Sequence, residues 1–270
     1  MSIACSMSAF KPPMEAACRT IADLGFDTVD LICIGGFGHV VPADLAADFD
    51  NRAQAVETIL SATGLTPVAA NIGVGPHLHD RSDAEANASR LAQVEAVARL
   101  MRRLGIRVGS FYPGYRAGDR TWVDVLGDAV ITIREMLEIA ARYDVRLAVE
   151  LHYATPFETV EQGARLLDAV PELGVAYDPS HYAMQGIDLR ETAPFLDRTV
   201  HVHMRDAAPE QMQVACGTGT VDFDWLLSAL EARSYTGHFS IEYLAKGDFD
   251  IGDSIRKTRD VIAQRRPARD

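Results

Sequence analysis

Four short hydrophobic segments in the second half of the chain each end near an acidic or imidazole side chain. These residues are Glu150 in LAVELH, Asp178 in VAYDPSH, His203 in VHVHMRD and Glu242 in FSIEYL. The gaps between them are 28, 25 and 39 residues, and each gap is long enough for a crossover helix between parallel strands. Three carboxylates and one imidazole brought to one place would form a site for a hard divalent cation.

The two glutamates carry the strongest signal, because each interrupts an apolar run that is typical of a buried strand. A carboxylate buried in such a run is costly unless it is paired or bound to a metal. Asp178, in the segment DPSH, would by itself indicate only the cap of a following helix. Beside Glu150 and Glu242, metal ligation by Asp178 is the better interpretation.

Two histidines lie two residues apart on one predicted strand, so their side chains point to the same face. We assign metal ligation to His203, which is nearer the carboxyl end of the strand, and a buried structural role to His201. The following residues, Arg205 and Asp206, would supply a cation for substrate oxygens and a carboxylate that orients a metal ligand.

Strand-like and helix-like segments alternate along the whole chain. We predict strands at Ser2–Met7, Thr28–Ile32, Thr66–Ile72, Arg107–Phe111, Arg146–Leu151, Gly174–Tyr177, Thr199–Met204 and His238–Tyr243. We predict helices at Met14–Leu24, Asp50–Thr63, Asp83–Leu104, Thr121–Tyr143, Phe157–Ala169, Leu189–Phe195, Phe223–Arg233 and Ile251–Gln264. Gly64 and Gly105 directly follow two of these helices, where a left-handed cap is favoured. Eight such pairs predict an α/β fold, a closed (β/α)8 TIM barrel whose strand ends meet at one mouth.

The composition fits one domain of this size. The chain has 270 residues, 48% hydrophobic and 24% charged, with a formal net charge of −12. We expect residues 1–264 to form the barrel and residues 265–270 to be a frayed tail. An acidic surface disfavours nucleic acid and acidic membranes as partners. Four scattered cysteines without a CxxC pair, and no apolar stretch of membrane-spanning length, favour a cytoplasmic location. The sequence is compatible with a monomer or a homo-oligomer.

The motifs of the second half resemble those of the xylose isomerase-like TIM-barrel superfamily, which contains sugar isomerases and epimerases, inosose dehydratases and endonuclease IV. The matching pieces are VELH, YDPSH, HVHMRD, GTGTVDF and GHFSIE, at residues 149–152, 177–181, 201–206, 217–223 and 237–242. The resemblance implies one Mn²⁺, Mg²⁺ or Co²⁺, with Zn²⁺ less expected, held by Glu150, Asp178, His203 and Glu242. It further implies that the two glutamates double as acid and base and that His181 contacts the substrate.

These observations predict a divalent-metal-dependent isomerase or epimerase that acts on a keto sugar or related hydroxy-carbonyl compound through an enediolate. Glu150 and Glu242 would flank the substrate carbon from opposite faces, one removing a proton and the other returning it. Loss of a β-hydroxyl from the same enediolate would make the protein a lyase or dehydratase of a sugar, cyclitol or dehydroshikimate-like compound. A nuclease like endonuclease IV is disfavoured, because strands 3 and 4 end in Asn71 and Tyr112 rather than zinc-binding histidines.

Candidate substrate-binding residues are His181, Arg205 and His152. His152 lies two residues beyond Glu150 and shares its strand face, where it either contacts the substrate or is a hydrogen-bonded histidine of the rim. Arg205 stands where many members of the superfamily have lysine. The segment GGFGH at residues 35–39 lacks the GxGxxG spacing of a dinucleotide site, and is either a substrate lid or an ordinary turn.

Overall fold

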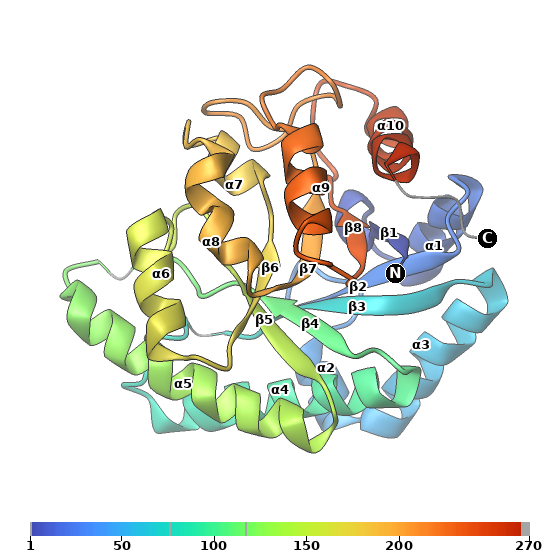
Figure 1. Cartoon of the computed structure of the whole chain (residues 1–270). Helices are drawn as coiled ribbons and strands as arrows, with labels where there is room; N and C mark the ends of the chain where they lie inside the picture. Colours follow the sequence, from blue (N-terminus) through green and yellow to red (C-terminus); the bar gives the residue numbers. More distant parts are fainter. Residues whose placement is uncertain (1, 76, 117, 266–270) are drawn as a thin grey trace.

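Eight parallel strands close into a barrel in the order of the sequence in a computed structural model that describes residues 2–75, 77–116 and 118–265 (Figure 1). The strands are β1 (Ile3–Ser6), β2 (Thr28–Ile34), β3 (Thr66–Gly73), β4 (Val108–Phe111), β5 (Arg146–Glu150), β6 (Gly174–Tyr177), β7 (Thr199–Met204) and β8 (Phe239–Ile241). Each strand pairs with the next, and β8 closes the ring on β1, with Phe239 beside Ile3. The predicted barrel is confirmed.

Helices surround the barrel (Figure 1). They are α1 (Met14–Asp23), α2 (Pro42–Ala47), α3 (Phe49–Thr63), α4 (Ala84–Leu104), α5 (Trp122–Arg142), α6 (Val160–Ala169), α7 (Ser180–Ala183), α8 (Ala193–Leu196), α9 (Phe223–Glu231) and α10 (Ile251–Gln264). Gly64 and Gly105 end α3 and α4 at φ values of 70° and 76°. Glycine suits both positions, because a side chain strains this left-handed backbone.

Two predicted helices differ from the structure. The segment predicted as one helix at Leu189–Phe195 is a 3-10 turn at Leu189–Thr192 followed by the four-residue helix α8. Pro194 explains the break, because it has no N–H and its ring clashes with the carbonyl four residues earlier. Helix α6 begins at Val160, three residues later than predicted, because Thr159 caps it in a reciprocal pair with Gln162. Helices α2 and α7 were not predicted.

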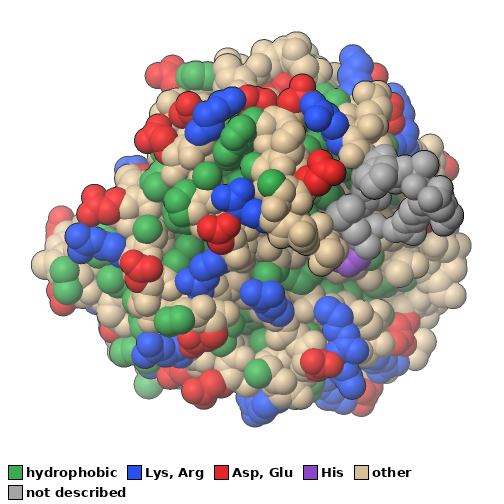
Figure 2. All heavy atoms as spheres, viewed as in Figure 1, with side chains coloured by type: hydrophobic (Ala, Val, Ile, Leu, Met, Phe, Trp, Pro, Cys, Tyr) green, Lys and Arg blue, Asp and Glu red, His purple; other side chains and the backbone are tan. Residues whose placement is uncertain are grey.

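Apolar residues of the strands and helices form one continuous core. Cys5, Cys18 and Cys33 are buried and Cys216 is partly exposed, and all four are free, as expected from their spacing. Within the described residues, no helix is both long enough and apolar enough to cross a membrane. On the face that Figure 2 shows, the described Lys and Arg side chains are interspersed with Asp and Glu. The predicted frayed tail lies, apart from Arg265, outside the described residues.

Candidate active site

The structure brings the four candidate metal ligands together at the carboxyl ends of neighbouring strands. Glu150 is the last residue of β5, Asp178 follows β6, His203 belongs to β7 and Glu242 follows β8. One donor atom from each residue lies within 4.8 Å of the donor atoms of the other three. None of the four residues is more than 6% exposed. Their approach follows from the barrel, in which adjacent strands end at the same mouth.

His203 stands between the two glutamates. Its Nδ1 lies 2.5 Å from Glu150 Oε1 and 3.2 Å from Glu242 Oε2. Across the barrel, Asn71 of β3 donates from Nδ2 to Glu242 Oε1 at 3.3 Å. One imidazole nitrogen therefore faces both carboxylates that the sequence assigned to acid–base chemistry.

The two glutamates differ in proton affinity. Burial opposes ionisation of Glu150, but the charge and hydrogen bond of His203 outweigh it and hold the pKa of Glu150 well below its usual value. Burial raises the pKa of Glu242 to about 7, and the charge on Glu150 adds to this effect. Burial also lowers the pKa of His203, but the two carboxylates outweigh burial and raise it well above 6.5. Glu150 thus keeps its charge at neutral pH, whereas Glu242, in the site without a cation, gains and loses its proton close to neutral pH.

The donor set fits a divalent cation. Three buried carboxylates within 4.8 Å of one another repel each other, and a shared cation relieves that repulsion. Oxygen donors with one imidazole nitrogen suit Mg²⁺, Mn²⁺, Co²⁺ or Zn²⁺, and the chemistry of the donors does not choose among them.

Arg205 forms hydrogen bonds to two residues of this cluster. Arg205 is 3% exposed, and its guanidinium donates from Nη2 to Asp178 Oδ2 at 2.8 Å. It also donates from Nε to Ser180 Oγ at 2.8 Å and from Nη1 to the backbone oxygen of Glu242 at 3.0 Å. Every guanidinium nitrogen therefore has a protein acceptor, and these contacts fix the positions of Asp178 and Glu242.

Two histidines lie between the cluster and the solvent. The fully buried His181 has its Nε2 3.6 Å from Asp178 Oδ2 and 4.0 Å from Glu150 Oε2. Burial, and next the neighbouring His152, lower the pKa of His181 well below 6.5, so this side chain is neutral. The His152 ring is partly exposed and lies 3.8 Å from the His181 ring between centroids. Tyr112 follows at 6.0 Å from His152, and these rings line one side of the mouth.

Residues 18–265 match the family described as "Xylose isomerase-like TIM barrel". The chain belongs to this family. The match covers strands β2 to β8, so it extends the resemblance seen in the second half of the sequence to most of the chain.

The chain is similar in sequence to one characterised enzyme and similar in structure to several solved proteins. Inosose dehydratase of Lactiplantibacillus plantarum is 29% identical over 126 residues, which cover 39% of this chain and 42% of that protein. The match thus spans less than half the length of that relative. Among solved structures, D-allulose 3-epimerase from Methylomonas sp. in complex with D-allulose has a TM-score of 0.79 at 16% identity, covering 98% of this chain and 97% of the other.

Two further structures are similar over almost the whole chain. The 3-keto-D-glucoside 4-epimerase YcjR from E. coli has a TM-score of 0.77 at 19% identity, covering 98% of this chain and 99% of the other. The IolI protein with a bound zinc atom has a TM-score of 0.75 at 17% identity, with coverages of 98% and 99%. At these identities the likeness shows a shared fold.

Two polar residues at the centre of this xylose isomerase-like barrel were not assigned from the sequence. Asp30 of β2 is fully buried, with Oδ2 3.3 Å from His201 Nε2 and 3.6 Å from His203 Nε2. Asn71 contacts Glu242. Asp30 lies inside the apolar run TVDLICI, which is the same signal that singled out Glu150, so the sequence could have revealed it. Asn71 gives no comparable signal.

One predicted role is wrong. Asp206, expected to orient a metal ligand, instead holds the loop after β7. Its carboxylate accepts backbone N–H groups from Gly217 at 2.8 Å and Gly219 at 2.9 Å, and also from Ala207 and Val221. The GTGT motif therefore closes around Asp206, and Gly219 is required because a Cβ there would meet this carboxylate at 2.1 Å.

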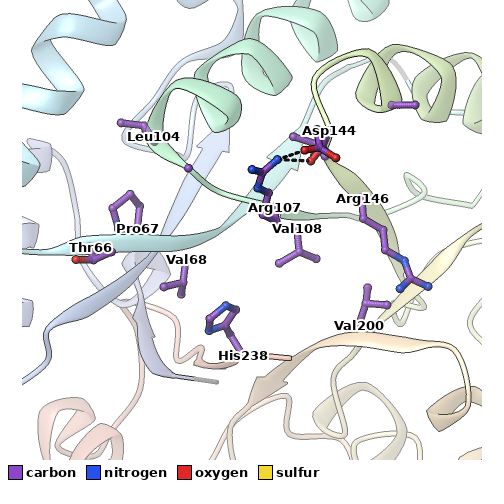
Figure 3. A pocket seen from close by; sticks show the side chains of 13 residues that line it. Thr66, Pro67, Val68, Leu104, Arg107, Val108, Asp144, Arg146, Val200 and His238 are labelled. Atoms are coloured by element: carbon purple, nitrogen blue, oxygen red, sulfur yellow. Dashed lines mark hydrogen bonds and ion pairs between the residues drawn. The ribbon is translucent and has the colours of Figure 1, made fainter. Parts of the chain in front are cut away.

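A hollow of about 850 Å³ lies at the opposite end of the family's barrel. Figure 3 shows Val68, Val108, Val200 and His238 around it, with Arg107 paired to Asp144 at its edge. These residues stand at or near the amino-terminal ends of their strands, whereas chemistry in such barrels takes place at the carboxyl ends. None of the four candidate ligands lines the hollow, so it is separate from the candidate active site.

Proposed function

We propose that the protein is a divalent-metal-dependent isomerase or epimerase of a keto sugar or a related hydroxy-carbonyl compound. The observation that supports this most directly is the placement of Glu150 and Glu242 on the same nitrogen of His203, with their pKa values displaced in opposite directions. A pair of carboxylates with divided protonation is what a base and an acid acting in turn require.

Glu150, Asp178, His203 and Glu242 would hold one divalent cation, which when bound polarises the substrate carbonyl and stabilises the negative charge that develops on its oxygen. Glu150, which keeps its charge, removes the proton from the carbon beside the carbonyl and leaves an enediolate. On the other face Glu242 would pass on a proton taken from water and so invert that carbon, and Glu150 would lose its proton to water before the next turnover.

The surrounding residues position the substrate and exclude water. The neutral ring of His181 can donate a hydrogen bond to a substrate hydroxyl beside Asp178 and Glu150. His152 lies one ring further out and would contact the part of the substrate nearer to solvent. Arg205 would act on the substrate through Asp178 and Glu242, whose positions it fixes.

A dehydratase of a sugar or cyclitol is the second candidate. The similarity to inosose dehydratase over 126 residues favours it. The first step is the same proton removal by Glu150, and Glu242 would then pass a proton to the departing hydroxyl group, which leaves as water, instead of to carbon.

Hydrogen exchange in D₂O would test the proposal. The purified protein, loaded in turn with Mn²⁺, Mg²⁺, Co²⁺ or Zn²⁺, would be incubated with a panel of keto sugars and inososes, and the products weighed by mass spectrometry. An epimerase adds one mass unit per exchanged hydrogen, whereas a dehydratase also removes the mass of water. No metal-dependent exchange with any member of the panel, in a protein shown to bind the metal, would refute both functions.

A further inference from the structure

Asp30 is a fully buried carboxylate near the centre of the barrel that the proposed reaction leaves without a role. Its Oδ1 is buried and has no hydrogen-bond partner among the described residues. Its Oδ2 faces two imidazole nitrogens, His201 Nε2 at 3.3 Å and His203 Nε2 at 3.6 Å. Burying a carboxylate with one oxygen unsatisfied is costly, so the two histidines must compensate for it.

The two nitrogens of His203 face different groups. Nδ1 points to the glutamates of the candidate cation site, at 2.5 Å from Glu150 and 3.2 Å from Glu242. Nε2 points the other way, and Asp30 is the carboxylate on that side. A neutral imidazole has one proton and one lone pair, so a ring that binds a cation through Nδ1 must carry its proton on Nε2.

The surroundings of Asp30 favour this placement of the proton. A proton on Nε2 points at the Asp30 carboxylate, whereas a lone pair there would be repelled by it. The separation of 3.6 Å is longer than a hydrogen bond and closes with a shift of a few tenths of an ångström. His201 holds the same oxygen from a ring tilted by 85° to that of His203, and Ser240 Oγ lies 3.0 Å from His201 Nε2.

We propose that Asp30 is a positioning residue that keeps the proton of His203 on Nε2 and so leaves Nδ1 free to bind the divalent cation. The inference rests on the proposed function, because it requires the cation site. It assigns a supporting role to His201, which holds Asp30 in place.

The same three side chains could instead hold a second ion, since their donor atoms also lie within 4.8 Å of one another. That arrangement would require His203 to bind one ion through each nitrogen and to give up both ring protons. It would also place the ion where Ser240 meets His201. The positioning role requires neither, and the number of ions bound per chain separates the two.

The decisive variant is Asp30→Asn, which keeps the shape of the side chain but removes its charge and offers an N–H group in place of one oxygen. We expect the dissociation constant for Mn²⁺ to rise about 10- to 100-fold. Thr28→Val is the matched control, because it removes a buried hydroxyl on the same strand that donates to the backbone oxygen of Ile3 and does not contact His203. This control should leave Mn²⁺ affinity unchanged.

A direct readout comes from ¹⁵N–¹H spectra of the histidine rings in the protein loaded with diamagnetic Zn²⁺. We expect the wild-type His203 ring to carry its proton on Nε2, and the His203 signals are identified as those that disappear in His203→Asn. A proton on Nε2 is required by the inference, and a proton on Nδ1 would overturn it even if Asp30→Asn does not fold.

The outcomes are separable. A proton on Nδ1 of His203 in the loaded wild-type protein, or two ions bound per chain, would overturn the positioning role. So would a folded Asp30→Asn protein with lower thermal stability but wild-type Mn²⁺ affinity, because that result means a structural role alone. If the wild-type chain itself binds no divalent cation, the proposed function fails, and the inference about Asp30 fails with it.

Discussion

Arg205 donates from Nη2 to Asp178 Oδ2 at 2.8 Å, and both side chains are almost completely buried. This ion pair places a fixed positive charge beside a cluster of three carboxylates that face a common centre. The guanidinium has a planar fork of donors and reaches Ser180, Asp178 and the backbone of Glu242 at once. An ammonium group has one nitrogen and cannot span these three acceptors.

Removal of the Arg205 charge should therefore destabilise the protein strongly. In Arg205→Met, Asp178 is left buried without its partner, and we expect a loss of about 3–5 kcal/mol in the free energy of unfolding. Arg205→Lys should lie between this variant and the wild type. Urea unfolding of the metal-free proteins measures the effect, and Arg19→Met, which breaks an exposed pair with Glu15, should cost less than about 1 kcal/mol. Equal losses for both methionine variants would contradict the role of Arg205.

Glu242→Gln should separate proton removal from proton return. Glu150 remains able to take the substrate proton, so we expect metal-dependent exchange of that hydrogen with D₂O while formation of the epimer falls about 10²- to 10⁴-fold. Glu150→Gln should lose both processes. Metal content is measured for each variant, since both residues are also candidate ligands, and the exposed Glu172→Gln serves as the control. Epimer formation at the wild-type rate by metal-loaded Glu242→Gln would exclude Glu242 as the acid.

The residues of this site that could be predicted from sequence are charged residues that interrupt an apolar segment. Glu150 and Glu242 stand out because apolar residues surround them along the chain, and the same contrast marks Asp30. The contacts of Asn71 and of the Arg205–Asp178 pair give no such signal in the sequence. They join residues that are far apart along the chain and meet only when the barrel closes. The hydrogen bonds of Asp206 to the GTGT loop likewise depend on how a loop folds back over a strand end.

The stability of the metal-free protein should fall as the pH rises toward and above 7. Burial raises the pKa of Glu242 from 4.5 in the unfolded chain to about 7 in the fold. A raised pKa contributes stability that is fully present below pH 4.5 and is lost as the pH rises through 7, by about 3 kcal/mol for this group. His203, whose pKa is also raised, acts in the same direction at higher pH, whereas Glu150 acts oppositely below pH 4.5. Thermal unfolding at pH 5 and pH 8 measures the change, and Glu242→Gln should reduce it; an unaltered pH dependence in that variant would mean that Glu242 titrates normally.

Binding of a divalent cation should reverse this trend, because the cation competes with protons for the same atoms. At neutral pH His203 Nδ1 must lose a proton before it binds a cation, and Glu242 must lose one as well. When the pH lies below the pKa of a group that must lose its proton, each unit of rise in pH increases the cation affinity about tenfold. We therefore expect Mn²⁺ affinity to rise at least about tenfold between pH 6 and pH 7. Calorimetric titrations in buffers of different ionisation enthalpy count the protons released. At an Mn²⁺ concentration 100 times its dissociation constant, the ion should stabilise the fold by about 2.7 kcal/mol, and a chelator should remove that gain. An affinity for Mn²⁺ that does not change with pH would show that the ion binds elsewhere than at His203 and Glu242.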